Sequence, residues 1–351
     1  MPLESLYLDN FRLFKNKKLT FKKNHIFILG NNGSGKTSLL EAINLVYTNK
    51  SIRTIDLAEC IKEGEQAFKI GVSGRNREHD FTRTLTKEKG KKLENKINTR
   101  NVNKAEMELP ILLLNKQLRL IDGDPETRRE FFNNLMFHVK HETKNISSNY
   151  FKVLSQRNRA IKKGAGKKEI SIWTDKLVDF GEKLNVYQKE VFLLYKKSIA
   201  KEVIPKRKLD FYKGLNLKFK KGWAGTKSFG ELLADNFEKD RVLGYTQFGP
   251  HKFDFNFYTY TKKSKNTLSR GQQKLLILLT FLSINDFFKS INRPGALLLI
   301  DDLSSELDKE NLKLFLNEVP KHENQIFITD IDSSNSLKKD LNDDTFERII
   351  I

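Results

Sequence analysis

Short apolar runs and turns alternate over the first hundred residues of the chain. Residues 5–8 alternate polar and apolar side chains, residues 19–21 could pair with them, and residues 25–29 are continuously apolar. A helical pattern then runs over residues 36–46, whereas residues 86–104 are polar enough to predict an exposed hairpin or loop. This part of the chain is therefore predicted to contain several strands and one helix.

The middle of the chain has a helical pattern. From Pro125 to about Ile204 it contains no further proline and little glycine, and the segment KKGAGKK (residues 162–168) interrupts it. We therefore predict two antiparallel helices that form a short arm, with a stem of at most ~45 Å. Apolar residues spaced alternately by four and three predict a packing seam along the second helix. The predicted seam residues are Trp173, Leu177, Phe180, Leu184, Tyr187, Val191 and Leu194.

After Pro205 the pattern returns to strands and helices. Residues 252–260 alternate as a strand, and residues 296–300 and 325–329 are short apolar strands. Because strand–turn–helix units occur near both ends, we expect an α/β fold in which the two ends form one domain around a helical insertion. The predicted domains are 1–120 (N-terminal half of the α/β domain), 121–240 (helical arm) and 241–351 (C-terminal half).

Composition limits the classes to which the protein can belong. The chain has 351 residues, of which 38% are hydrophobic and 31% charged, so it can form real cores. Its single cysteine, Cys60, excludes a disulfide framework within the chain. No signal peptide pattern opens the sequence, and the longest nearly apolar run, residues 275–284, is shorter than the ~20 residues that cross a bilayer. We expect a cytoplasmic protein without a membrane partner.

The formal net charge is +20, from 64 Lys+Arg and 44 Asp+Glu. Residues 297–351 are net acidic, whereas the rest of the chain is strongly basic, which favours a polyanion-binding surface outside this segment. Most of the cations are lysines, however, and an AT-rich genome produces that bias without selection for binding. Charge alone therefore leaves nucleic-acid binding open.

Residues 30–37 read GNNGSGKT and fit the phosphate-binding loop G-x-x-x-x-G-K-[ST], between an apolar strand and a helix. In such a loop successive backbone N–H groups surround the β-phosphate, and glycine is needed because side chains would block that approach. The charge of Lys36 would lie on the β- and γ-phosphates, and the Thr37 hydroxyl would bind Mg²⁺. The predicted ATP-binding residues are Gly30, Asn31, Asn32, Gly33, Ser34, Gly35, Lys36 and Thr37.

Two acids follow the apolar run at residues 297–300. Asp301 would hold Mg²⁺, directly or through water, together with Thr37. Asp302 would orient or deprotonate the attacking water. Acids often end buried strands, but the pairing with a phosphate-binding loop gives these two a chemical role. The predicted catalytic residues are therefore Lys36, Asp301 and Asp302.

The segment LSRGQQK (residues 268–274) precedes a strongly apolar helix, where Ser269 is placed like an N-cap. The start of such a helix is an anion site. This segment resembles the signature of ABC-type ATPases, and Ser305–Asp308 resembles their D-loop. In that superfamily two heads enclose two ATP molecules, and the signature of one head caps the γ-phosphate bound to the other. The resemblance implies that Ser269, Arg270, Gly271, Gln272 and Asp308 act in trans.

Within that superfamily the chain most resembles the RecF family of bacterial recombination mediators. The resemblance implies an ABC-type P-loop ATPase head with a mixed sheet and an inserted arm, ATP and Mg²⁺ as cofactors, and an ATP-dependent homodimer. It also implies duplex, gapped or junction DNA as a ligand, RecO and RecR as partners in loading RecA, a nucleoid-associated location, and contact of Arg12 with a nucleotide phosphate. The segments that carry it are Leu8–Arg12, Gly30–Thr37, Asp122–Pro125, Arg128–Phe131, Gln156–Asn158, Phe248–His251, Leu268–Lys274, Ile300–Asp302 and Ser305–Asp308.

Two departures from transporter ATPases bear on the rate of hydrolysis. Thr329-Asp330 stands where transporters have Thr-His, and Asp302 is one methylene shorter than their glutamate. Both departures favour slow hydrolysis, which suits a DNA-stimulated switch better than a pump.

Three other classes remain as alternatives. A transporter subunit would carry the switch histidine and bind a membrane partner. The ATPase module of a phage-defence nuclease would need a nuclease domain after the ATPase. A chromosome-organising SMC-type ATPase would need coiled coils much longer than residues 125–204 can form.

Overall fold

The computed structural model describes residues 3–76, 79–99, 109–202, 214–293, 295–305, 307–331 and 343–351. The chain forms two compact units. The first unit consists of Met1–Leu118 and Ser269–Ile351, and the second unit consists of Arg119–Leu268. The fold class is the expected α/β class, with one parallel sheet and two antiparallel sheets in the described residues.

A parallel sheet of five strands lies at the centre of the first unit. Its order is β13 (Phe346–Ile350), β3 (His25–Gly30), β12 (Ile326–Ile331), β11 (Ala296–Ile300) and β7 (Leu109–Leu113). Every neighbouring pair is parallel. All residues of β3 and β11 are buried, as continuous apolar runs in a sheet covered on both faces should be. The carboxyl ends of β3, β11 and β12 therefore meet at one edge of the sheet.

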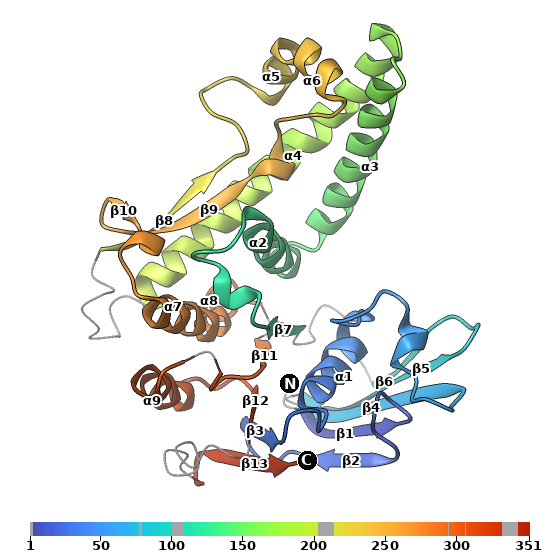
Figure 1. The fold of residues 1–351 in the computed structure, drawn as a ribbon, viewed down its shortest axis with the longest axis vertical. Helices are drawn as coiled ribbons and strands as arrows, with labels where there is room; N and C mark the ends of the chain where they lie inside the picture. Colours follow the sequence, from blue (N-terminus) through green and yellow to red (C-terminus); the bar gives the residue numbers. More distant parts are fainter. Residues whose placement is uncertain are drawn as a thin grey trace. The chain divides into compact units, whose positions relative to one another are not determined.

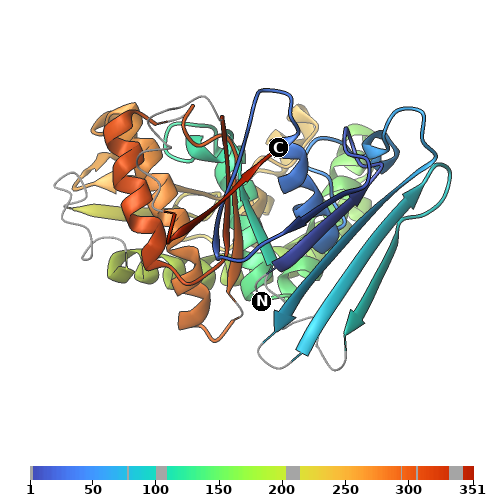
Figure 2. The ribbon, with the colours of Figure 1, turned by 90° about the horizontal axis from the view of Figure 1, so that it is seen from below.

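An antiparallel sheet forms the other layer of the first unit. Its order is β2 (Lys17–Thr20), β1 (Leu3–Asp9), β4 (Ala67–Asn76), β5 (His79–Glu88) and β6 (Glu94–Thr99), coloured blue to cyan in Figure 2. The pairing of β1 with β2 confirms the sequence-based prediction. The polar segment 86–104 supplies the turn and the strand β6 of a hairpin; residues 100–104 lie outside the described residues.

Helix α1 (Lys36–Thr48) packs against strands of both sheets. Its residues Leu39, Leu40 and Ile43 are fully buried in the main core, together with side chains from the two sheets. In the described part of the first unit there are also α7 (Arg270–Leu282), α8 (Ile284–Ser290) and α9 (Lys309–Glu318), with 3₁₀ turns η1 (Leu57–Cys60) and η7 (Val319–Lys321).

The second unit is built around a helical pair, α3 (Glu142–Lys162) and α4 (Lys167–Glu202), which lie side by side (Figure 1). At 1.5 Å per residue the 21-residue α3 limits the paired stem to about 32 Å, within the predicted limit, while the 36-residue α4 runs for about 54 Å. The unit also contains α2 (Pro125–Val139), α5 (Phe229–Asp235), α6 (Phe237–Leu243), η5 (Pro250–Lys252) and η6 (Ser264–Asn266), while η3 (Gln117–Arg119) spans the division between the units.

The predicted boundary at residue 240 is wrong, because the second unit continues to Leu268. The cause is strand pairing. The phenylalanine-rich strand β9 (Asp254–Thr259) lies between β8 (Leu215–Lys220) and β10 (Lys262–Lys263) in a three-stranded antiparallel sheet. Because β9 pairs with β8 and β10, it belongs to a sheet of the second unit and not to the sheets of the first.

The predicted seam of α4 is fully buried at every second position, whereas Trp173, Phe180 and Tyr187 are half-buried. Leu177, Leu184 and Val191 are buried, but Leu194 is 39% exposed. The other buried line passes through Gly181, Gln188 and Tyr195, which lie one position further along. Gly181 is needed there because a Cβ atom would lie 2.5 Å from Cε1 of Phe229. A glycine and a glutamine therefore belong to the seam, which hydrophobicity alone does not reveal.

Candidate nucleotide-binding site

The glycine loop follows the buried strand β3 and ends at the first residue of α1. Gly33 and Gly35 have φ angles of 80° and 102°, in the left-handed region that favours glycine. A Cβ atom on Gly35 would lie 2.6 Å from Cζ of Phe14, and one on Gly30 would lie 2.7 Å from the carbonyl oxygen of Ile351. The loop therefore has the tight backbone that the motif predicts, while Asn31 and Asn32 are exposed.

Lys36 is folded back over the loop. Its Nζ donates hydrogen bonds to the carbonyl oxygens of Gly30 (2.7 Å) and Asn31 (2.9 Å), and the residue is 9% exposed. The ammonium group therefore lies inside the segment that the motif is expected to wrap around a phosphate.

Thr37 and Asp301 meet at the carboxyl edge of the parallel sheet. The Thr37 hydroxyl donates to the Asp301 carboxylate at 2.9 Å, although 264 residues separate the two in sequence. Thr329, on β12, donates to the same carboxylate at 2.6 Å. A hydroxyl and a carboxylate are hard oxygen ligands, and Mg²⁺ in nucleotide sites uses one or two carboxylates plus phosphates. The pair fits Mg²⁺, and no group of three or more His, Cys, Asp or Glu that could form an all-protein metal site occurs in the described ranges.

Asp302 has an unusual backbone for a non-glycine residue. Its φ is 52°, its N–H donates to Oγ1 of Thr329 at 2.8 Å, and its Oδ1 is buried with no hydrogen-bond partner. An unpaired carboxylate oxygen is chemically able to accept a proton or a hydrogen bond from water once a water molecule reaches it. The role of Asp302 stays a prediction.

The signature segment begins α7 with a reciprocal capping box. The hydroxyl of Ser269 accepts from the N–H of Gln272, whose side chain accepts from the N–H of Ser269. Ser269 and Arg270 are exposed. Gly271 lies against the D-loop, because a Cβ there would be 2.8 Å from Oδ2 of Asp308.

Asp308 is itself the N-cap of α9. Its carboxylate accepts from the N–H of Asn311 at 2.8 Å, and this hydrogen bond lowers the pKa of Asp308. The structure thus brings the signature and the D-loop together within one chain. Glu306 of the D-loop lies outside the described residues.

Arg12 contacts a carboxylate. Its guanidinium donates to both carboxylate oxygens of the fully buried Glu41 on α1, at 3.0 and 2.8 Å, and to the carbonyl oxygen of Glu59 at 3.0 Å. The hydrogen bonding with Glu41 raises the pKa of Arg12. Arg12 therefore ties the connection after β1 to the helix of the glycine loop, and its contact with a phosphate stays a prediction.

Other segments of the family resemblance hold the second unit together. Arg128 forms a two-pronged ion pair with Asp254, at 2.7 and 3.2 Å, and Arg157 is fully buried with Asp240 at 2.9 Å. His251 Nδ1 lies 2.6 Å from the hydroxyl oxygen of Tyr150. Burial lowers the pKa of His251 to about 4, which favours the neutral imidazole beside the Tyr150 hydroxyl.

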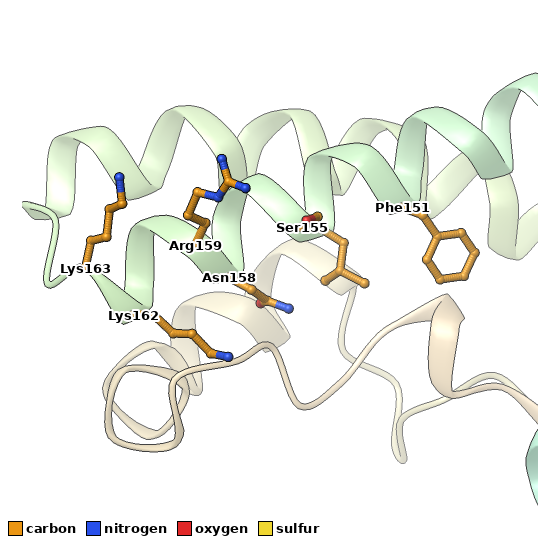
Figure 3. Close-up of a pocket in the computed structure, with 7 residues that line it drawn as sticks. Phe151, Ser155, Asn158, Arg159, Lys162 and Lys163 are labelled. Atoms are coloured by element: carbon orange, nitrogen blue, oxygen red, sulfur yellow. The ribbon is translucent and has the colours of Figure 1, made fainter.

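A cavity of about 540 Å³ lies along one face of α3, where the lining residues recur every three or four positions (Figure 3). No residue of the nucleotide motifs lines it, so this cavity is not the candidate site. Its lining residues are Phe151, Leu154, Ser155, Asn158, Arg159, Lys162 and Lys163.

Three residues near the site are not among the predicted site residues. Thr329 and Asp330 lie near the end of β12, and Ser304 directly precedes the D-loop. Thr329 accepts a hydrogen bond from the N–H of Asp302, and Asp330 accepts from the N–H and the hydroxyl of Ser304. The one available signal was the position of Thr329-Asp330 at the end of a buried strand beside the acidic strand end. None of the described helices is long and apolar enough to span a membrane.

The fold and the motif geometry define a class, the ATPase heads of ABC and SMC type. A family model described as the RecF/RecN/SMC N terminal domain matches residues 2–347. The solved Smc head bound to the C-winged helix domain of ScpA has a TM-score of 0.55 at 15% identity, covering 96% of this chain and 91% of that one.

Within this class, full-length similarity points to one family. The DNA replication and repair protein RecF of Teredinibacter turnerae is 30% identical over 347 residues, 96% of this chain and 91% of the relative. The same protein of Enterobacter sp. (strain 638) is 30% identical over 344 residues, 96% and 95% of the two chains. A solved structure of the recombination mediator protein RecF with ATP in the RecFOR pathway has a TM-score of 0.78 at 23% identity, covering 95% and 92%. The chain belongs to the RecF family of ABC/SMC-type ATPases.

Proposed function

We propose that this chain is an ATP-dependent recombination mediator that binds DNA as a nucleotide-bridged dimer and releases it on slow hydrolysis. The observation that carries the ATP-dependent part is the approach of Thr37 to Asp301 within 2.9 Å beside the glycine loop. The DNA-dependent part is supported by the net charge of +20 and by relatives described as DNA replication and repair proteins.

In this proposal the loop from Gly30 to Gly35 binds the phosphates through backbone N–H groups at the positive end of the α1 dipole. Lys36 adds a positive charge beside the β- and γ-phosphates. Thr37 and Asp301 would hold Mg²⁺, which supplies charge neutralisation at the phosphates. Asp302 orients or deprotonates the attacking water, and its short side chain suits slow turnover.

The signature requires a second copy of the chain. The start of α7 presents backbone N–H groups and the exposed Ser269 and Arg270, which together suit an anion. Two copies arranged head to head would place this helix start against the γ-phosphate held by the partner copy. ATP would then join the two copies, and hydrolysis would separate them.

The molecular mass in solution, measured by sedimentation with and without Mg·ATP, tests the dimer. We expect ATP-dependent dimers for the wild type, no ATP binding for Lys36→Met, and ATP binding without dimers for Ser269→Arg. The matched control is Ser228→Arg, because Ser228 forms the same capping box with Glu231 at the start of α5 in the second unit. This control variant should dimerise like the wild type. Normal dimers from Ser269→Arg, or a monomeric wild type at saturating ATP, would show the proposal to be wrong.

A titration of duplex and gapped DNA over a range of salt concentrations tests the DNA-dependent part. A protein that neutralises ~6–10 phosphates loses ~10³–10⁵-fold in affinity between 50 and 200 mM salt. We expect such a slope, with tighter binding when ATP is present and faster hydrolysis when DNA is added. Affinity that responds neither to salt nor to ATP contradicts the proposal. By relationship to RecF, RecO and RecR are the partners we propose for loading RecA.

A further inference from the structure

The end of strand β12 is unusually polar for a buried position. Thr329 and Asp330 both have no exposed surface, although β12 lies between β3 and β11 in the parallel sheet. Successive residues of a strand point to opposite faces, so the two side chains serve different neighbours. Thr329 reaches Asp301, as described above, and Asp330 reaches Ser304, the residue directly before the D-loop.

Three consecutive backbone N–H groups after Asp301 donate to this two-residue strand end. The N–H of Asp302 donates to the Thr329 hydroxyl at 2.8 Å, that of Leu303 to the Thr329 carbonyl at 3.2 Å, and that of Ser304 to the Asp330 carboxylate at 3.2 Å. These bonds hold the left-handed backbone of Asp302, a conformation that costs about 1–2 kcal/mol for a residue with a Cβ. Residues of β12 therefore hold the backbone between Asp301 and the D-loop in place.

Asp330 makes this attachment with a carboxylate that no described cation neutralises. Its partners are the Ser304 hydroxyl at 2.5 Å, the Ser304 N–H and the Ile331 N–H at 2.7 Å. Burial raises the pKa of Asp330, and the nearby charge of Asp302 acts in the same direction. Burying a carboxylate costs free energy unless hydrogen bonds compensate for the lost hydration. The bonds that hold Ser304 are therefore what accounts for a buried carboxylate at position 330.

The segment that Asp330 holds continues to the signature. Ser305 donates from its hydroxyl to the carbonyl oxygen of Asp302 at 2.9 Å, and Asp308 then caps α9 where it touches Gly271. Hydrogen bonds thus connect Thr37, Asp301 and β12 to Ser304 and Ser305, and Asp308, further along the same loop, lies against the signature surface proposed to meet the partner copy.

We infer that Asp330 is a positioning residue, which fixes the D-loop through Ser304 so that the nucleotide site and the signature surface keep one relative position. The inference rests on the proposed function only in its second consequence, that this position favours the ATP-bound dimer. The first consequence, local order of the D-loop, concerns the single chain.

Amide hydrogen exchange of the nucleotide-free chain tests the first consequence. We expect Asp330→Asn, which keeps the side-chain shape, and Ser304→Ala each to accelerate exchange in a peptide spanning Asp302–Ser305 by about tenfold, with α1 unchanged. The double variant should exchange no faster than the single ones, because both remove the same contact. The control is Ser283→Ala, a buried serine of the first unit, whose hydroxyl donates to the Thr280 carbonyl. Unchanged exchange in Asp330→Asn, or acceleration throughout the chain, overturns the inference.

Sedimentation with Mg·ATP tests the second consequence. We expect Asp330→Asn to bind a fluorescent ATP analogue within twofold of the wild type but to dimerise about tenfold more weakly. If Asp330→Asn exchanged faster locally but dimerised as well as the wild type, the proposed link between D-loop order and dimerisation would be wrong. If it also lost about tenfold in ATP affinity, Asp330 would instead belong to the nucleotide pocket. A wild type that never dimerises would refute the proposed function, and the exchange result alone would then decide whether Asp330 positions the D-loop.

Discussion

Replacement of Arg157 by methionine should strongly destabilise the second unit. Arg157 lies on α3, where its Nε donates to the Thr174 hydroxyl at 3.0 Å and its Nη1 to the Asp240 carboxylate at 2.9 Å and to the Thr246 hydroxyl at 2.5 Å. The side chain of Arg157 is 0% exposed and that of Asp240 is 1% exposed. Methionine fills much of the volume of the arginine stem but leaves the buried Asp240 carboxylate without a cation.

The magnitude follows from burial. Breaking a fully buried ion pair by removing one partner costs about 3–5 kcal/mol, because the remaining charge is desolvated without compensation. Asp240 also accepts from the N–H of Gln247 at 3.1 Å, and that bond survives in the variant. The double variant Arg157→Met/Asp240→Asn removes the buried negative charge, and the side-chain oxygen of the introduced asparagine can still accept from the Gln247 N–H. We therefore expect the double variant to recover at least half of the free energy of unfolding that Arg157→Met loses.

Urea unfolding followed by circular dichroism measures these differences. The matched control is Lys183→Met, which breaks the pair between Lys183 and Asp179 on α4; those side chains are 55% and 56% exposed. An exposed pair of this kind contributes less than ~1 kcal/mol. If Arg157→Met lost no more stability than Lys183→Met, the buried-charge argument would be refuted. ATP affinity should not change in the folded variant, since all of these contacts lie within residues 119–268.

Two further predictions concern the glycine loop and pH. Gly35→Ala should weaken binding of a fluorescent ATP analogue at least tenfold, because a Cβ would lie 2.6 Å from Phe14 at a φ of 102°. Gly33→Ala should weaken it less, because that Cβ would meet no atom within 4 Å and only backbone strain remains; equal effects would contradict the steric argument. Since burial lowers the pKa of His251 to about 4, the unfolded chain binds more protons between pH ~4 and ~6.5. The free energy of unfolding should therefore fall as pH falls through this window, and His251→Gln should flatten the slope; an unchanged slope would exclude His251 as a cause.

The parts of the site that lie next to one another in sequence could be predicted. The glycine loop, the strand before it and the helix after it form one local unit, and the strand Ala296–Ile300 is confirmed at both ends. Such units can be predicted from the sequence because hydrophobic periodicity, glycine placement and helix capping depend on residues only a few positions apart.

The parts that depend on distant contacts could not be predicted. The strand at residues 254–259 was assigned to the wrong unit because alternation identifies a strand but not its partner. Gly181 and Gln188 were missed in the α4 seam because neither is hydrophobic, although one allows close packing and the other donates to the Pro250 carbonyl. The attachment of Ser304 to Asp330 joins the loop after β11 to strand β12, and only the pairing of these two strands in the parallel sheet brings the residues together.

The arginines in the segments of the family resemblance differ in their hydrogen-bond partners. Arg128 and Arg157 have carboxylate partners inside the second unit, and Arg12 has one in Glu41. An arginine that pairs with a buried carboxylate already uses part of its guanidinium, and moving it away to a phosphate would leave that carboxylate unpaired, at a cost of several kcal/mol. Arg270 differs because it is exposed at the start of α7 and no ion pair involving it occurs among the described residues. If a phosphate on a partner copy binds to an arginine of this chain, the physical argument therefore favours Arg270 over Arg12, Arg128 and Arg157.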